Sequence, residues 1–313
     1  MRVGLVVDSA CDLPASFINE HRIEVVPITV HLGERSFVDR RDSGETLEFY
    51  RKHLSAGGAA STDPPAVADV KALFLKRLVL EYDYVFCLAI ASTRSPTFAN
   101  IQAACLEILA TYKKVRTDAK VVGPFMTRVM DTQNLFAGQG VTAIEAAHMI
   151  AAGAAPNQIR QKLEALIPQT YGYLLPNSLY QLRARAREKG DHSVGWLRYA
   201  VGTALDVKPL VRAFRGATAP IATLRHYAEG VARCFAFVSD LIEAGKLLAP
   251  TVCVGYGGDL KELEELPGYS DFVAAARTSG VTVYPSIMSI TGGIHVGERA
   301  LALAFAAQEH EFK

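Results

Sequence analysis

The chain has 313 residues, of which 50% are hydrophobic and 21% are charged, and its formal net charge is +1. This length is enough for two domains with buried cores, the composition excludes a disordered chain, and the balanced charge argues against a nucleic-acid partner. Five cysteines without a Cys-x-x-Cys pair predict reduced thiols in the cytoplasm, and the absence of a long uncharged apolar stretch predicts no transmembrane segment.

Strands and helices alternate through the first half of the chain. The apolar runs predict strands over Val3–Val7, Glu24–His31, Tyr84–Ile90, Ala119–Val122 and Val129–Asp131. Helical spacing predicts helices over Phe17–Arg22, Leu47–Leu54, Ala66–Leu80, Thr97–Tyr112 and Gln139–Ala152. Pro27 favours an edge position for the second strand, because proline has no N–H to donate. This order indicates a parallel sheet covered by helices on both faces.

The second half predicts a further α/β unit. Its expected helices are Ile159–Leu166, the basic Asn177–Lys189, His226–Ala244 and Leu260–Leu266. Its expected strands are Gln169–Leu175, Val201–Val211, Ile221–Leu224, Thr251–Tyr256 and Val281–Pro285. The last segment, His295–Phe312, is expected to start in a glycine-rich loop and to end as a helix. We therefore predict an α/β protein of two domains: a parallel-sheet domain over residues 1–160 and an α/β (α+β) domain over residues 161–313.

Hydroxyl and acidic side chains follow two of the predicted parallel strands. Asp8 and Ser9 come after the first strand, and Ser92, Arg94, Ser95 and Thr97 come after the strand at Tyr84–Ile90. Ligands of open parallel sheets bind beyond the carboxyl ends of the strands, and a helix N-terminus suits a carboxylate or a phosphate. The alternative is ordinary capping of the helix that follows, a common role for serine and threonine.

Two further segments are candidates for the same site. Ser61 and Thr62 form a second hydroxyl loop before a helix, and here too capping is the alternative. His295 lies in a glycine-rich stretch, where it is either structural or a hydrogen-bond donor to an anion. We find no Gly-x-x-x-x-Gly-Lys-Ser/Thr loop for ATP and no metal-ligand spacing, and so expect neither a cofactor nor a metal.

Arg183, Arg185 and Arg187 form a basic run on the predicted helix Asn177–Lys189. A solvated helix surface explains such a run. The alternative is a docking patch for an acidic partner or a transient contact with a membrane surface.

Taken in order, these segments resemble the DegV family of bacterial fatty-acid-binding proteins over nearly the whole chain. The motifs that carry the resemblance are Asp8-Ser9-Ala10-Cys11-Asp12-Leu13-Pro14, Val26-Pro27-Ile28, Ser61-Thr62-Asp63-Pro64-Pro65, Ser92-Thr93-Arg94-Ser95-Pro96-Thr97, Asp131-Thr132, Asp206-Val207-Lys208-Pro209-Leu210 and His295-Val296-Gly297 followed by Ala300-Leu301.

The resemblance implies a lipid-binding subunit of a fatty acid kinase rather than an enzyme. Such proteins hold one long-chain fatty acid in a tunnel of the first domain, and a separate kinase phosphorylates its carboxylate for phospholipid synthesis. By the family match, Ser95, Ser61 or Thr62, and His295 would donate to the carboxylate. Arg94 replaces an apolar residue of the family, and it either contacts the head group or points to solvent.

Two other functions remain open at this point. An acyl hydrolase would use Ser95 as nucleophile, His295 as base, and Asp8 or Asp12 to orient the base. A carrier of a different lipid, such as a polyprenyl chain, would use the same binding site.

Overall fold

The computed structural model describes residues 1–54, 60–178 and 207–312. The first half forms a four-stranded sheet in the order β2-β1-β6-β7, in which all neighbouring strands are parallel. Its strands are β1 (Val3–Asp8), β2 (Glu24–Val26), β6 (Tyr84–Ala89) and β7 (Met126–Asp131). The predicted parallel sheet is confirmed.

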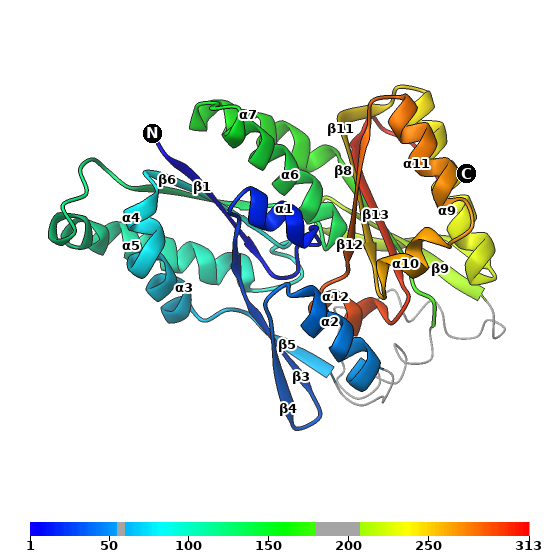
Figure 1. Cartoon of the computed structure of the whole chain (residues 1–313), viewed down its shortest axis with the longest axis horizontal. Helices are drawn as coiled ribbons and strands as arrows, with labels where there is room; N and C mark the ends of the chain where they lie inside the picture. Colours follow the sequence, from blue (N-terminus) through cyan, green and yellow to red (C-terminus); the bar gives the residue numbers. More distant parts are fainter. Residues whose placement is uncertain (55–59, 179–206, 313) are drawn as a thin grey trace.

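Helices cover both faces of this sheet, as Figure 1 shows. One face carries α1 (Ala15–Glu20), α6 (Ala137–Ala151) and α7 (Pro156–Leu166). The other face carries α3 (Val67–Leu73), the helical turns η2 (Phe74–Leu78) and α4 (Val79–Glu81), and the long α5 (Thr97–Asp118). Adjacent strand residues point to opposite faces, so β1 sends Val7 to the first helical layer and Val6 to the second.

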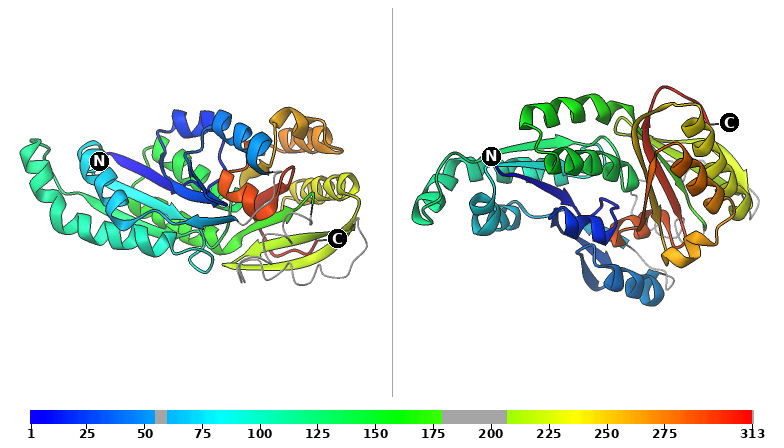
Figure 2. Two further views of the ribbon diagram at one scale, coloured as in Figure 1. Left: turned by 90° about the horizontal axis from the view of Figure 1, so that it is seen from below. Right: turned by 45° about the horizontal axis from the view of Figure 1, so that its top comes forward.

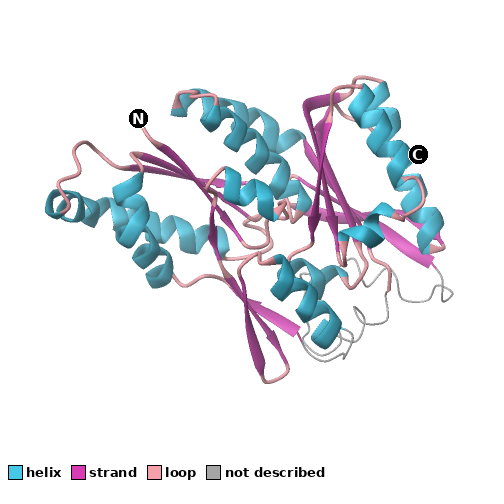
Figure 3. Cartoon of the chain, in the orientation of Figure 1, coloured by secondary structure: helices cyan, strands magenta, loops and turns pink. Residues whose placement is uncertain are grey.

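A small antiparallel sheet projects from the first half (Figure 3). It has the order β4-β3-β5 and is accompanied by α2 and the turn η1. The bounds are β3 (Ile28–Leu32), β4 (Arg35–Asp39), β5 (Ala60–Asp63), α2 (Ser43–Phe49) and η1 (Tyr50–Leu54). The single strand predicted over Glu24–His31 is wrong, since the chain passes from the parallel sheet to this sheet at Pro27. The next N–H, of Ile28, leaves the ladder and donates to Ser9 Oγ at 2.9 Å.

The second half forms a six-stranded mixed sheet in the order β10-β9-β8-β13-β11-β12. Only the β11–β12 pair is parallel among the described pairings. The strands are β8 (Thr170–Leu175), β9 (Val207–Phe214), β10 (Ala217–Arg225), β11 (Leu247–Tyr256), β12 (Thr282–Ile287) and β13 (Leu301–Ala307). The turn η3 (Ile167–Gln169) leads into β8. The predicted α/β class of this half is confirmed.

Helices of the second half lie mainly on the outer face of the mixed sheet (Figure 1). They are α9 (Tyr227–Glu243), α10 (Leu260–Glu264) and α11 (Tyr269–Thr278). The helix α11 was not predicted from the sequence. The short α12 (Ile290–Val296) instead packs against β3, β5 and η1 of the first half.

The helix α6 lies between the two large sheets and joins them. It contacts β1 and β6 on one side and β8, β11 and β13 on the other, and the two views of Figure 2 show it in this position. One hydrophobic core therefore contains residues of both sheets, among them Leu88 of β6 and Ala304 of β13.

Two further predictions of secondary structure are wrong. Residues Ala119–Val122 form no strand, because α5 continues to Asp118 and Val122 is 91% exposed, with no layer to pack against. His295 lies in the helix α12 rather than in a loop, and the chain ends in the central strand β13 rather than in a helix. The predicted helix Asn177–Lys189, from Leu179 on, and the start of the strand Val201–Val211 lie outside the described residues.

Candidate functional site

Asp8 and Ser9, at the carboxyl end of β1, are fully buried. The Asp8 carboxylate accepts hydrogen bonds from Ile90 N at 2.7 Å, Gln139 Nε2 at 3.0 Å and Ala10 N at 3.1 Å. Burial away from water raises the pKa of Asp8 to about 6, although these donors favour the charged form. The buried Asp8 side chain thus joins the end of β1 to Ile90 after β6 and to Gln139 of α6. Ser9 Oγ joins the same strand end to Ile28 N.

The loop after β6 lies against both halves of the molecule. Ser92 Oγ donates to the carboxylate of Asp131 at the end of β7, and Thr93 Oγ1 donates to Gly216 O. Gly216 belongs to the turn between β9 and β10, and its own N–H donates to Gln133 O at 2.7 Å. These bonds hold the predicted Ser92–Thr97 segment at the junction between the parallel sheet and the mixed sheet.

Within this loop, Ser95 contacts the start of α5. Its Oγ accepts a hydrogen bond from Thr97 N at 3.2 Å and lies 2.8 Å from Thr97 Oγ1. Thr97 is fully buried, whereas Arg94 and Ser95 are partly exposed and Ser92 is exposed. The hydroxyl of Ser95 therefore supports the start of α5, and the residue itself is partly exposed.

Ser61 and Thr62 lie on the strand β5, so the loop predicted for them is wrong. They pair with His31 and Val30 of β3, and both are partly buried. The chain after β5 contacts the helix that follows the Ser92–Thr97 segment, since Asn100 Nδ2 in the first turn of α5 donates to Pro65 O at 3.0 Å.

His295 is partly buried on α12, the helix that packs against β5. Ser289 caps this helix by accepting a hydrogen bond from Gly292 N at 2.9 Å. The hydroxyl of Tyr50 donates to Met288 O at 2.7 Å and to Ser289 O at 3.0 Å, which holds α12 on the first half. Gly293 is required there, because a Cβ would lie 2.4 Å from the Tyr50 ring.

A buried charged cluster, made of Asp12, Asp39 and Arg41, anchors the same junction and was not predicted as a unit. Asp12 accepts from Ser289 N at 2.8 Å and from Arg41 Nη1 at 3.4 Å, and Asp39 accepts from both the N–H and the hydroxyl of Thr291 at 2.9 Å. Burial raises the pKa of Asp12 to about 6 and raises that of Asp39, while Arg41 opposes both shifts. Asp12 was visible in the motif after the first predicted strand, but its N–H partner Ser289 is 277 positions away in the sequence.

Three elements carry the predicted donors, and two of them, α12 and β5, pack against each other. β5 carries Ser61 and Thr62, the loop after β6 carries Ser95, and α12 carries His295. Hydroxyl and imidazole groups donate hydrogen bonds, which a carboxylate needs when it leaves water. Arg183, Arg185 and Arg187 lie outside the described residues.

Residues 1–54, 60–178 and 207–312 contain no group of three or more His, Cys, Asp or Glu side chains placed to hold a metal ion. All five cysteines are buried and free. None of the described helices is long and apolar enough to cross a membrane.

The fold and the junction define a two-sheet α/β protein whose halves share one core. Comparison with known proteins identifies the family of this protein. The chain matches the DegV family, described as an uncharacterised protein family, over residues 2–308. It is 50% identical over 313 residues to a DegV domain-containing protein of Xanthomonas campestris, covering 100% of this chain and 99% of that protein. The chain belongs to the DegV family.

Solved structures share the fold over nearly the whole chain. DegV of Bacillus subtilis, a fatty acid binding protein, has a TM-score of 0.74 at 21% identity and covers 98% of this chain and 100% of its own. A stearic acid-binding protein of Eubacterium ventriosum has a TM-score of 0.73 at 20% identity, with 97% and 98% covered. These similarities confirm the fold that the sequence predicted.

Proposed function

We propose that this protein binds one long-chain fatty acid, with the carboxylate at the junction of the two halves. The supporting observation is the match of the whole fold to structures described as fatty acid binding proteins, one of them with stearic acid. In this proposal Ser95, Ser61 or Thr62, and His295 donate hydrogen bonds to the carboxylate. No cofactor takes part, and the reduced cysteines suit the cytoplasm.

The physical balance favours such a ligand. Each buried methylene contributes roughly 0.8 kcal/mol, so a long acyl chain offsets the cost of ordering the ligand. A carboxylate left without donors in the interior would cancel much of this gain. The hydroxyl groups that reach the junction supply donors without placing a second charge in the interior.

Mass spectrometry of the purified protein tests the proposal. Denaturation should release about one fatty acid per chain, as expected for a site with a single carboxylate position. Ser95→Ala should lower the affinity for added fatty acid about tenfold, since it removes a hydrogen bond to a charged group. Ser279→Ala, a change at an exposed serine after α11, is the control. A protein that neither carries nor binds a fatty acid would contradict the proposal.

We further propose that the bound carboxylate is presented to a separate ATP-dependent kinase, with Arg183, Arg185 and Arg187 as the docking residues. Incubation of the loaded protein with ATP and a cell extract of its source organism should yield an acyl phosphate, which hydroxylamine traps as a hydroxamate. Replacement of the three arginines by alanine should reduce the hydroxamate and leave fatty acid binding intact. Hydroxamate formation at the same rate without this protein would refute presentation but not binding.

The hydrolase alternative loses support from the contacts of its candidate orienting acids. Both Asp8 oxygens accept hydrogen bonds from Ala10, Ile90 and Gln139, and the hydrogen bonds of Asp12 come from Ser289 and Arg41. Among the described residues, neither acid is hydrogen-bonded to a histidine that could act as base. If the protein instead carries a different lipid, the mass spectrum of the released ligand will identify that lipid.

A further inference from the structure

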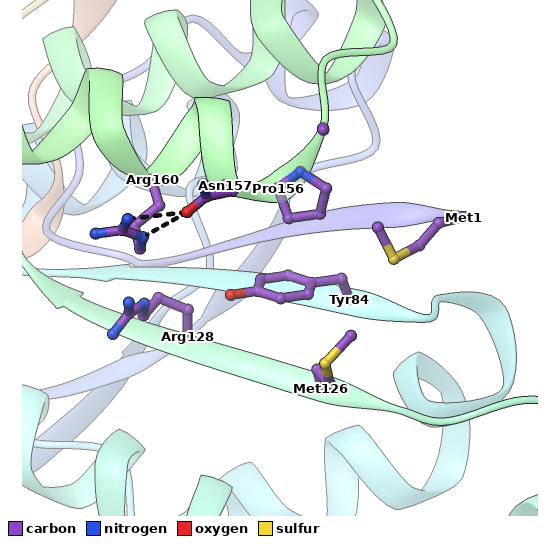
Figure 4. Close-up of a pocket in the computed structure, with 8 residues that line it drawn as sticks. Met1, Tyr84, Met126, Arg128, Pro156, Asn157 and Arg160 are labelled. Atoms are coloured by element: carbon purple, nitrogen blue, oxygen red, sulfur yellow. Dashed lines mark hydrogen bonds between the residues drawn. The ribbon is translucent and has the colours of Figure 1, made fainter.

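A cavity of about 420 Å³ opens at the amino ends of the parallel strands, on the edge of the sheet opposite to Asp8. Figure 4 shows the side chains around it. Its main lining residues are Met1, Tyr84, Met126, Arg128, Asn157 and Arg160. Neither the predicted loops nor the junction of the two halves takes part in this cavity.

The apolar side of the cavity is a part of the sheet that remains uncovered. Tyr84 and Met126 are neighbours in the β6–β7 register at the start of their strands. The covering helix α7 begins at Pro156, and Met126 remains 40% and Met1 70% exposed. Met1, Tyr84 and Met126 thus form the apolar wall of the cavity.

The other side of the cavity is cationic. Arg160 is held by Asn157 Oδ1, which accepts from its Nη2 at 2.8 Å, and by an ion pair with Glu164. Arg128 lies 4.0 Å from the same carboxylate and makes no hydrogen bond within the described parts of the chain. Two guanidinium groups thus face one carboxylate, which leaves a net positive charge and unused donors.

The ring of Tyr84 extends from the apolar side of the cavity to its cationic side. Figure 4 shows its hydroxyl end pointing toward Arg128 and Arg160, with Met1 and Met126 at the other end. The hydroxyl itself has no hydrogen-bond partner among residues 1–54, 60–178 and 207–312, and adds a further donor at the cationic end. The cavity therefore has a polar end for an anion and an apolar end for an uncharged body.

We propose that this cavity binds a small phosphate ester with an apolar body. The phosphate oxygens accept hydrogen bonds from Arg128 and Arg160, because guanidinium groups match phosphate geometry and charge. The body packs on the Tyr84 ring and on the thioethers of Met1 and Met126, which adapt to irregular shapes. This site is separate from the proposed fatty acid site, and its existence does not depend on that function.

Methionine methyl NMR on the full-length protein tests the proposal with phenyl phosphate as the probe. The chain has five methionines, of which Met1 and Met126 line the cavity. Phenyl phosphate should shift these two signals in a saturable way. It should leave Met288 unchanged, since that residue lies at the junction where its carbonyl accepts from Tyr50. Phenol and inorganic phosphate, each of which lacks one half of the ligand, should bind more weakly.

Variants decide which residues recognise the phosphate. Arg128→Gln should weaken phenyl phosphate about tenfold, and Arg277→Gln, a change at an exposed arginine of α11, should have no effect. An unchanged Met288 signal in the free variant shows that the variant is folded. Arg160→Gln is the second variant and should also weaken the binding of phenyl phosphate. Tighter binding of butyl phosphate would identify an alkyl ester, and tighter binding of phenyl phosphate an aryl ester. The proposal fails if neither cavity methionine shifts, or if Arg128→Gln binds as tightly as the unmodified protein.

Discussion

Asp8, Asp12 and Asp39 are carboxylic acids held in the interior, each by backbone N–H groups of another segment. Removal from water disfavours the charged form more than these donors favour it, so the pKa of each acid is raised. A raised pKa means that the folded protein binds the proton more tightly than the unfolded chain does. Such a group stabilises the fold below its unfolded pKa and loses that contribution as the pH rises through its folded pKa.

We expect Asp8→Asn to change the pH dependence of stability. The pKa of Asp8 is raised from 3.8 to about 6, so its contribution to the free energy of unfolding should fall by about 2 kcal/mol between pH 4 and pH 7. The variant lacks this titration, and its stability relative to the unmodified protein should therefore improve over this range. Urea denaturation at intervals of pH measures the difference.

The control for this measurement is Asp271→Asn, a change at an exposed carboxylate of α11. It should reproduce the pH profile of the unmodified protein. If Asp8→Asn gives that same profile, burial does not raise the pKa of Asp8 in solution.

At the scale of elements, α6 is built from small residues because sheets pack on both of its sides. Gly140 illustrates the limit of space: a Cβ there would lie 2.6 Å from Asp12 O and 3.3 Å from Cys253 Sγ. The strand β13 presents the matching surface. Its Leu303 and Phe305 face α9 and α11, whereas Ala302 and Ala304 face α6.

Gly140→Ala should therefore destabilise the protein, although alanine is the better helix former. Overpacking against a backbone carbonyl costs about 1–3 kcal/mol, which outweighs the gain of about 1 kcal/mol in helix propensity. Gly44→Ala on α2 is the control, because its methyl would meet only the side chain of Asp42. Equal free energies of unfolding for the two variants would show that α6 has room to move.

The alternation in β13 explains why its helix prediction was wrong. Alanine favours helices when it is considered alone, but large and small residues alternate with a period of two from Leu301 to Ala306. That period is the signal of a strand with two different faces. The predictions for β1 and β6 were confirmed because continuous apolar runs leave little choice of structure.

At the scale of the molecule, one core connects the two halves. Leu88 of the parallel sheet and Ala304 of the mixed sheet belong to the same buried cluster around α6. The predicted boundary between residues 160 and 161 falls inside α7, whose Ile159 and Leu163 belong to that core as well. Removing either half would expose apolar surface of the other.

We therefore expect the halves to unfold together. Cys87 of β6 and Cys234 of α9 are both buried and provide a probe in each half. Their labelling by a thiol reagent should begin at the same urea concentration, as expected for a single cooperative transition. Labelling of Cys234 at a clearly lower concentration would show that the second half unfolds alone.

Local physical rules in the sequence determined the alternating elements, the parallel sheet and the segments at its carboxyl edge. Apolar periodicity and strand-end side chains depend on neighbours along the chain. Only the tertiary structure decided which of these side chains are buried, because burial depends on distant segments. It enclosed Asp8 and Ser9, left Ser95 partly exposed, and placed the helix of His295 against β5.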